Sequence, residues 1–260
     1  MNAKYDSIAG HYNQTRKADP YLLQKLYDKL DPQSNEHYLD VGCGSGNYSL
    51  GLIEKGVQLD GVDPSEEMLK IIRSKAPQRQ WTKAKVEELP FPDAHFNGGT
   101  AFLTIHHWDD LIKGFAEIHR ICKKGARFIL FSSCSEQMQG YWLRHYFPEM
   151  MDASIQQMPS FIHILEAILH SGLKVYSRDN YFVKPDLQDL FLYNGKEDPE
   201  RYFDAGIRAG ISSFSNLCSD EELNRGLTRL RSDIDGGEFE KIKQENEHEE
   251  GDYYFLTLFK

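Results

Sequence analysis

Three closely spaced glycines, Gly42, Gly44 and Gly46, form the part of the sequence best suited to bind a ligand. They follow a short apolar run and precede a helical pattern. Glycine lets the backbone turn sharply and approach a ligand closely, and the following helix offers free N–H groups at its N-terminus. In dinucleotide-binding proteins the third glycine comes three residues after the second, where this sequence has Asn47. The spacing therefore departs from the nicotinamide-dinucleotide pattern.

Two carboxylates stand near the glycines in positions that could serve a ligand. Asp40 lies two residues before Gly42 and either orients the loop or meets the ammonium group of an amino-acid ligand. Asp63 lies 17 residues after Gly46, at the end of the next predicted strand. An acid there can accept hydrogen bonds from both hydroxyls of a ribose, as an adenosyl ligand would supply. Each feature alone has a structural alternative, since glycines also make turns and an aspartate before a proline also caps a helix.

The elements that would position these residues alternate between strand and helix patterns. Strands are predicted at 38–41, 57–63, 96–104 and 127–132, and helices at 47–55, from residue 64 onward and at 111–122. Gly125 is expected to end the last of these helices. Strands that alternate with helices at this spacing predict an α/β fold with a doubly wound, parallel sheet.

The second half of the chain has a different organisation. A helix is predicted at 159–170 and strands at 173–183 and 253–259. The long stretch between the strands is rich in helix signals, and a structureless loop of that length is improbable in a compact domain. We expect residues 1–132 to form the core, 133–157 a cap segment, 158–183 and 253–260 the rest of the core sheet, and 184–252 a helical insertion that forms a substrate cap. The charged run 238–250 reads as a solvated helix or a mobile linker.

Composition and charge narrow the range of partners. The net charge of −10 disfavours a nucleic-acid substrate, because an acidic chain is repelled by phosphates. No apolar run approaches the length of a membrane span, and the first residues lack the apolar core of a signal peptide. The four cysteines are scattered without a C-x-x-C pair, which argues against disulfides and a metal site. These observations predict a cytoplasmic protein without membrane or nucleic-acid partners, either a monomer or a homodimer.

Five sequence blocks in order across residues 38–132 resemble the class I methyltransferases, specifically their type 11 group. The blocks are Leu39-Asp40-Val41-Gly42-Cys43-Gly44-Ser45-Gly46, then Gly61-Val62-Asp63-Pro64-Ser65 with Met68-Leu69, then Glu87-x-Leu89-Pro90-Phe91-Pro92-Asp93, then Ile105-His106-His107-Trp108, then Arg120-Ile121 with Gly125. The resemblance implies a Rossmann-like fold with a mostly parallel, seven-stranded sheet, helices on both faces and a helical cap. It also implies S-adenosyl-L-methionine as the cofactor and S-adenosyl-L-homocysteine as the product.

The resemblance also implies roles for individual residues. The glycine loop, with Cys43, would pass under the methionyl and ribose parts of the cofactor, and Asp40 and Asp63 would serve it as described above. The remaining expected contacts are Pro64, Ser65 and Met68 beside the adenine, Val86 and Glu87 at the adenine edge, Ala101, Phe102 and Leu103 near the methionyl group, and Tyr12 and Arg16 over the methionine carboxylate. Many relatives have an acid where this chain has Lys85, which cannot accept a hydrogen bond from adenine.

Methyl transfer makes few demands on catalytic side chains. The enzyme mainly has to align the acceptor with the sulfonium methyl and exclude water, and it needs a general base only if the acceptor must lose a proton. His107 is the candidate base, because imidazole groups titrate near neutral pH; the alternative is that it packs or caps the next turn. The aromatic residues at 141–147 either line an acceptor pocket or form the packing face of a cap helix.

Four readings of function follow from these features. The leading one is methyl transfer from S-adenosylmethionine to a small-molecule acceptor whose identity the sequence leaves open. The second is a non-catalytic protein that binds or senses the cofactor. The third is a nicotinamide-dependent oxidoreductase, which the early third glycine disfavours. The fourth is an RNA or protein methyltransferase, against which the acidic charge argues. The lack of an N-P-P-Y or D-P-P-Y block argues against amino methylation of DNA bases or of protein glutamine.

Overall fold

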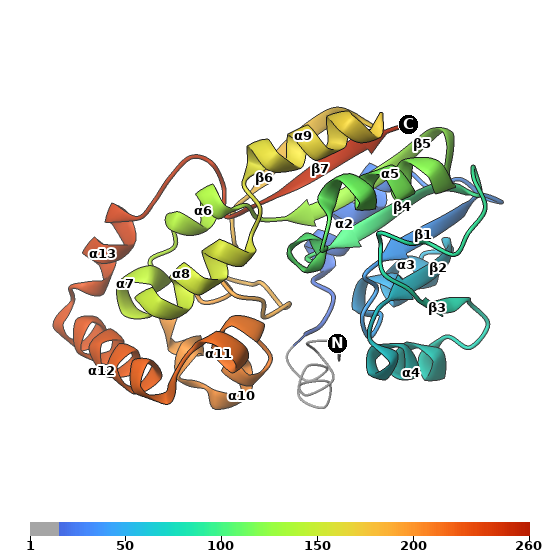
Figure 1. Ribbon diagram of the computed structural model, residues 1–260. Helices are drawn as coiled ribbons and strands as arrows, with labels where there is room; N and C mark the ends of the chain where they lie inside the picture. Colours follow the sequence, from blue (N-terminus) through green and yellow to red (C-terminus); the bar gives the residue numbers. More distant parts are fainter. Residues whose placement is uncertain (1–15) are drawn as a thin grey trace.

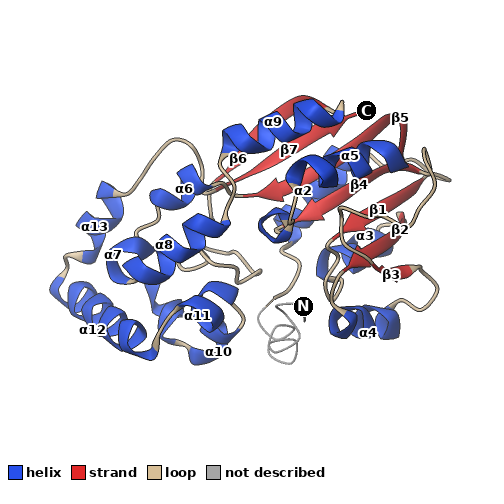
Figure 2. Cartoon of the chain, in the orientation of Figure 1, coloured by secondary structure: helices blue, strands red, loops and turns tan. Residues whose placement is uncertain are grey.

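A seven-stranded sheet forms the centre of the molecule in the computed structural model, which describes residues 16–260 (Figures 1 and 2). Its spatial order is β3-β2-β1-β4-β5-β7-β6. The strands are β1 (His37–Val41), β2 (Gln58–Asp63), β3 (Trp81–Lys83), β4 (Phe96–Phe102), β5 (Cys122–Ser132), β6 (Lys174–Tyr181) and β7 (Tyr253–Phe259). Only β7 runs antiparallel to its neighbours, so the sheet is mostly parallel, and the predicted doubly wound α/β fold is confirmed.

Helices cover both faces of the sheet because successive side chains of a strand point to opposite sides. On β1, Tyr38 joins the apolar cluster formed with α2 (Pro20–Leu30) and α3 (Asn47–Glu54). Its neighbour Leu39 joins a second cluster, formed with α5 (Leu111–Ile121) and α9 (Phe161–Ser171). The helix α4 (Glu66–Lys75) packs through Leu69 and Ile72 against Trp81 of β3. The carboxyl ends of the parallel strands are thus held at one edge of a rigid layer.

A group of short helices gathers beyond one end of the sheet, on the left in Figure 1. It contains α6 (Ser135–Gln139), α7 (Leu143–Tyr146), α8 (Pro148–Gln157), η2 (Pro199–Phe203), α10 (Ala205–Ala209), α11 (Ser212–Leu217), α12 (Asp220–Gly236) and α13 (Phe239–Glu245). We call these helices the cap. The buried carboxylate of Glu222 in α12 accepts hydrogen bonds from the backbone N–H groups of Glu149 and Met150 in α8. Segments far apart in the sequence therefore pack as one unit.

Several local predictions need correction. The helix α5 ends at Ile121 and β5 begins at Cys122, so Gly125 does not end the helix but lies within β5, with φ of 85°. The charged run 238–250 is not merely a solvated segment, because Phe239 of α13 is buried and its ring meets that of Trp142 edge to face. Within the part of the chain that the structure describes, no helix is long and apolar enough to cross a membrane.

The sequence analysis also missed two elements. The strand β3 is only three residues long, too short to show an alternating pattern. The helix α2 begins after Asp19, whose side chain accepts hydrogen bonds from the N–H groups of Tyr21 and Leu22, and Pro20 takes the first helical position. This pair is a common signal for a helix start, and it was available in the sequence.

Candidate active site

The glycine loop leaves β1 at Val41 and enters α3 at Asn47. Gly42, Gly44 and Gly46 all have positive φ, at 75°, 52° and 87°. A Cβ atom on Gly42 would lie 2.2 Å from Thr104 Oγ1, and one on Gly46 would lie 2.2 Å from Ile72 Cδ1. Among residues 16–260, nothing lies within 4 Å of a Cβ placed on Gly44. Packing within this part of the chain therefore restricts Gly42 and Gly46, whereas it leaves room at the backbone of Gly44 that a ligand can approach.

Asp63 holds the glycine loop from the end of β2. Its Oδ2 accepts a hydrogen bond from the N–H of Gly44 at 2.9 Å, and its Oδ1 accepts one from the N–H of Ser65 at 2.8 Å. The Oγ of Ser65 in turn caps α4 by accepting from the N–H of Met68. The carboxylate thus lies beside the middle glycine, as the sequence spacing suggested, and it orders both flanking loops.

Asp40 lies beneath the loop, inside the fold. Its carboxylate accepts hydrogen bonds from Ser49 Oγ at 2.5 Å and from Thr100 Oγ1 at 2.8 Å. Burial raises the pKa of Asp40, and the two hydroxyl bonds oppose that rise. These contacts tie β1 to α3 and β4, so they match the loop-orienting alternative. A contact with a ligand ammonium stays a prediction.

The segment after β3 carries the residues expected at the adenine edge. Val86 is buried beside Trp108, while Lys85 is exposed and pairs with Asp109 at 2.5 Å. The carboxylate of Glu87 accepts from the backbone N–H of Asp109 at 2.7 Å and of Asp110 at 3.2 Å. Its side chain therefore anchors the loop before α5 and leaves the backbone of the segment to meet a ligand.

Arg120 and Glu117 of α5 hold the motif at 89–93 from below. The guanidinium of Arg120 donates to the backbone oxygens of Leu89 and Phe91 at 2.8 and 2.7 Å. It also forks onto Glu117 at 2.7 and 2.8 Å, and Glu117 accepts from the N–H of Leu89 at 2.8 Å. Arg120, the arginine of the last sequence block, thus stabilises the loop at 89–93, which follows the segment expected at the adenine edge.

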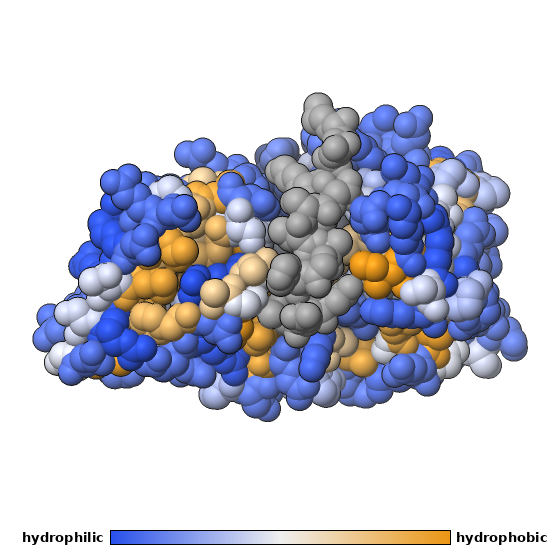
Figure 3. All heavy atoms as spheres, turned by 90° about the horizontal axis from the view of Figure 1, so that it is seen from below, coloured by the Kyte–Doolittle hydropathy of each residue, from blue (hydrophilic) through white to orange (hydrophobic). Residues whose placement is uncertain are grey.

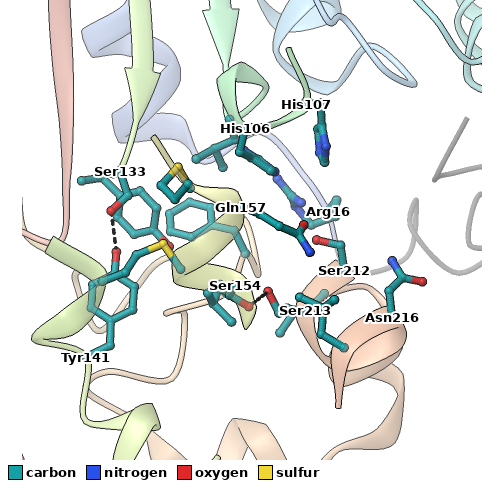
Figure 4. A pocket seen from close by; sticks show the side chains of 18 residues that line it. Arg16, His106, His107, Ser133, Tyr141, Ser154, Gln157, Ser212, Ser213 and Asn216 are labelled. Carbon is teal, nitrogen blue, oxygen red and sulfur yellow. Dashed lines mark hydrogen bonds between the residues drawn. The ribbon is translucent and has the colours of Figure 1, made fainter. Parts of the chain in front are cut away.

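A cavity of about 420 Å³ opens where β4 ends, between the sheet and the cap (Figure 4). At its sheet edge, Leu103 has φ of 52°, an unusual value for a branched residue, and passes the chain into the short turn Ile105–His107. The lining residues are Arg16, Leu103, His106, His107, Ser133, Met138, Tyr141, Ser154, Gln157, Met158, Phe191, Leu192, Ile211, Ser212, Ser213, Asn216, Leu217 and Tyr253. The candidate base His107 therefore lies on a partly open, mostly apolar cavity.

Arg16 reaches this cavity from the N-terminal side and binds a buried acid. Its Nε lies 2.5 Å from Asp189 Oδ1, and its second terminal nitrogen lies 3.3 Å from Oδ2. The hydroxyl of Tyr48, in the helix after the glycine loop, donates to the same carboxylate at 3.1 Å. Burial raises the pKa of Asp189, and the charge of Arg16 opposes that rise. Tyr12, expected to act with Arg16, lies outside the described residues.

The cavity also shows which functional candidates the sequence analysis missed. Asp189 lies between Leu187 and Leu190 in the insertion, and no motif spacing in the sequence marks it as a site residue. Ser154 and Ser213 are likewise unmarked in the sequence, and only the folded chain brings them into contact. Of the aromatic residues at 141–147, Trp142, Tyr146 and Phe147 are buried in packing, whereas Tyr141 also lines the cavity. Among residues 16–260, no group of three or more His, Cys, Asp or Glu could hold a metal ion.

This strand order, with a glycine loop after β1 and an acid at the end of β2, defines a class I S-adenosylmethionine-dependent methyltransferase fold. Residues 39–130 match the family described as "Methyltransferase domain", which is the type 11 group of that class. The recognised resemblance is confirmed.

Relatives of known name extend the comparison. A Mycobacterium tuberculosis protein named as an uncharacterised methyltransferase is 30% identical over 146 residues, covering 55% of this chain and 57% of its own. A Rickettsia massiliae ubiquinone/menaquinone biosynthesis C-methyltransferase is 35% identical over 157 residues, covering 54% and 63%. The chain thus spans little more than half the length of these curated relatives.

A solved structure matches nearly the whole chain. It is described as a proposed methyltransferase from an antibiotic biosynthesis pathway of Anabaena variabilis. It covers 95% of this chain and 99% of its own, with a TM-score of 0.81 and 28% sequence identity. The similarity therefore includes the cap as well as the sheet.

Proposed function

We propose that this protein is an enzyme that transfers a methyl group from S-adenosylmethionine to a small-molecule acceptor bound under the cap. The observation that carries the proposal is the cavity itself, which Leu103 lines just after β4. Arg16 also lines it, and the backbone oxygen of Arg16 accepts a hydrogen bond from Asn47, the residue that follows the glycine loop. Acceptors in doubly wound folds bind at the carboxyl ends of the strands, where this cavity lies. The net charge of −10 supports a small molecule over a nucleic acid.

The chain's own residues fit the cofactor. The open backbone at Gly44 and the carboxylate of Asp63 beside it suit a ribose and its hydroxyls. We assign the cofactor contacts to Asp40, Gly42, Cys43, Gly44, Gly46, Asp63, Pro64, Ser65, Met68, Val86, Glu87, Ala101, Phe102 and Leu103, with Tyr12 and Arg16 at the methionine carboxylate. S-adenosylmethionine supplies an electrophilic methyl group. The protein aligns the acceptor and excludes water.

An apolar, ring-containing acceptor suits the walls of the cavity. Met138, Phe191 and Tyr253 present apolar and aromatic surface to it. Seen from below, hydrophobic residues also gather on the cap side of the molecule (Figure 3). Several relatives are named for ubiquinone, menaquinone or demethylmenaquinone methylation, so a quinone-like ring is one acceptor of the proposed class. His107 would take the proton of an acceptor that has to lose one.

Formation of S-adenosylhomocysteine tests the proposal. The purified protein is incubated with S-adenosylmethionine and a neutral metabolite extract, and the product is measured by mass spectrometry. We expect S-adenosylhomocysteine together with a metabolite heavier by one methylene unit. Cofactor binding without product from any extract would instead support the non-catalytic, cofactor-binding alternative.

A further inference from the structure

The buried serines that line the cavity are of two kinds, and the first kind is bonded to the backbone of the fold. Ser133 Oγ donates to the backbone oxygen of Asp252 at 3.0 Å, and the Tyr141 hydroxyl donates to the same oxygen. Asp252 stands directly before β7, so these bonds hold the cap segment to the sheet. Both hydroxyl protons are therefore bound to a backbone oxygen, and the two residues contribute to the structure of the cavity wall.

Ser154 and Ser213 are of a second kind. They come from α8 and α11, and Ser154 Oγ donates to Ser213 Oγ at 2.9 Å (Figure 4). Their exposed fractions are only 6% and 9%, and both residues line the cavity. A serine hydroxyl carries one donor proton and two acceptor sites. Among the described residues no hydrogen bond takes up the proton of Ser213, so the pair offers a buried donor to the cavity.

The serine pair lies across the cavity from the reacting end. The sheet edge contributes Leu103, His106 and His107, whereas the pair stands on cap helices (Figure 4). The rest of the lining includes the apolar Met138 and Phe191, while Gln157 and Arg16 lie between the two ends (Figure 4). A molecule whose methylated atom lies at the sheet edge therefore reaches the serine pair with its opposite end.

The charge of the lining favours an uncharged molecule. Arg16 is the sole Asp, Glu, Lys or Arg among the described lining residues, and it forks onto Asp189, whose side chain is 1% exposed. The two charges compensate each other within the wall. A net charge on the acceptor would thus lose its hydration without gaining an opposite charge in the described wall.

We propose that the acceptor is an uncharged, largely apolar ring compound with a carbonyl or hydroxyl oxygen at the end remote from the methylated atom. The Ser154–Ser213 pair binds that oxygen. This specificity rests on the proposed function, because it assumes that the methyl donor lies at the sheet edge.

Matched naphthalene probes test the proposal in protein saturated with S-adenosylhomocysteine. The probes are 2-naphthol, naphthalene-2,6-diol, which adds a remote hydroxyl, and 6-hydroxy-2-naphthoate, which puts a charge there. Dissociation constants are measured by calorimetry. We expect the diol to bind about tenfold tighter than 2-naphthol, the worth of one buried hydrogen bond, and the naphthoate to bind more weakly than the diol.

Two variants attribute the preference to the serine pair. In Ser154→Ala with Ser213→Ala, both hydroxyls are lost together, and the diol should lose its advantage over 2-naphthol. Ser215→Ala, on the exposed side of α11, should keep it. Equal binding of the two neutral probes to the natural protein, failure of both to bind, tighter binding of the naphthoate, or a preference that survives the double substitution would overturn the proposal. Saturation with S-adenosylhomocysteine is measured first, so a failure of cofactor binding is seen separately.

Discussion

At the scale of single residues, the motifs serve the fold and the proposed cofactor together. Gly46 leaves room for the side chain of Ile72, and the carboxylate of Asp63 accepts a hydrogen bond from the N–H of Gly44. The guanidinium of Arg120 donates to the backbone oxygens of Leu89 and Phe91. The sequence predicted that the glycine loop and Asp63 serve one ligand, because they follow consecutive strands of one sheet, and it predicted no contact of Arg120. It did not predict the internal bonds of Asp40 or Glu87, since partners such as Thr100 and the N–H of Asp109 are identified only by the folded chain.

Gly46→Ala tests the packing requirement of the loop. The new Cβ would lie 2.2 Å from Ile72 Cδ1, and the alanine would have to adopt a φ near 87°. We therefore expect a loss of about 3 kcal/mol in the free energy of unfolding. Gly56→Ala is the matched control, because its φ is 90° but nothing lies within 4 Å. It should cost only about 1 kcal/mol. Urea unfolding measures both; equal losses would mean that the contact with Ile72 is unimportant.

Glu117→Gln tests the contact between Glu117 and Arg120 through the pH dependence of the free energy of unfolding. Hydrogen bonds from Arg120 lower the pKa of Glu117 below its ordinary value of 4.5. A lowered folded-state pKa stabilises the protein above the unfolded value, and this contribution is lost as the pH falls through the folded one. The natural protein should therefore exceed the variant by about 1 kcal/mol at pH 7. The gap should shrink below pH 4.5; a gap independent of pH would contradict the assignment.

At the scale of elements, buried contacts join three parts of the chain: residues 16–19 before α2, the helix α3 that follows the glycine loop, and the loop between β6 and η2. Asp189 binds Arg16 and Tyr48, and the N–H of its neighbour Gln188 donates to Asp19 at 3.0 Å. The ring of Tyr48 stacks on Phe102 at the end of β4, with centroids 3.6 Å apart. The loop between β6 and η2, which leads into the cap, is thereby bonded to the helix that follows the glycine loop, so the proposed cofactor and acceptor sites share one support.

Asp189→Asn tests this support. Removing the charge takes the Asp189 carboxylate away from Arg16, and we expect a loss of about 3 kcal/mol in unfolding free energy. In Arg16→Met with Asp189→Leu both charges of the pair are gone, so much of the stability should return, while affinity for S-adenosylhomocysteine should not. Denaturant unfolding and calorimetric titration of the three proteins give the two readouts. Recovery of both together would mean that the pair is purely structural.

Element prediction succeeded where the pattern was long and failed where it was short or tertiary. The parallel strands and α5 show clear periodicity, whereas β3 has three residues and is defined by its pairing with β2. Gly125 resembled a helix end because it follows an amphipathic run, but the chain is already extended at Cys122 and pairs there with Phe96. Glycine supplies a left-handed backbone in strands as readily as at helix ends.

At the scale of the whole molecule, the cavity proposed to bind the acceptor lies where the sheet and the cap meet. The lining comes from the end of β4, the cap segment, the insertion and the start of β7. No spacing rule links positions such as Ser154 and Ser213, 59 residues apart, so the sequence indicated a region and not its chemistry. The position of the glycine loop and of Asp63 could be predicted because a single strand–loop–helix unit and the next strand supply them, and their role in cofactor binding stays a prediction.

The central claim is that the loop between β1 and α3, with Asp63, binds S-adenosylmethionine. Calorimetric titration of S-adenosylhomocysteine into the natural protein, Asp63→Asn and Asp60→Asn tests it most directly. Asp60 is a buried acid of the same strand that bonds to the N–H of Gln80 instead. We predict binding to the natural protein and to Asp60→Asn with similar affinity, and binding at least tenfold weaker to Asp63→Asn. No binding to the natural protein, or equal affinity in both variants, would contradict the account.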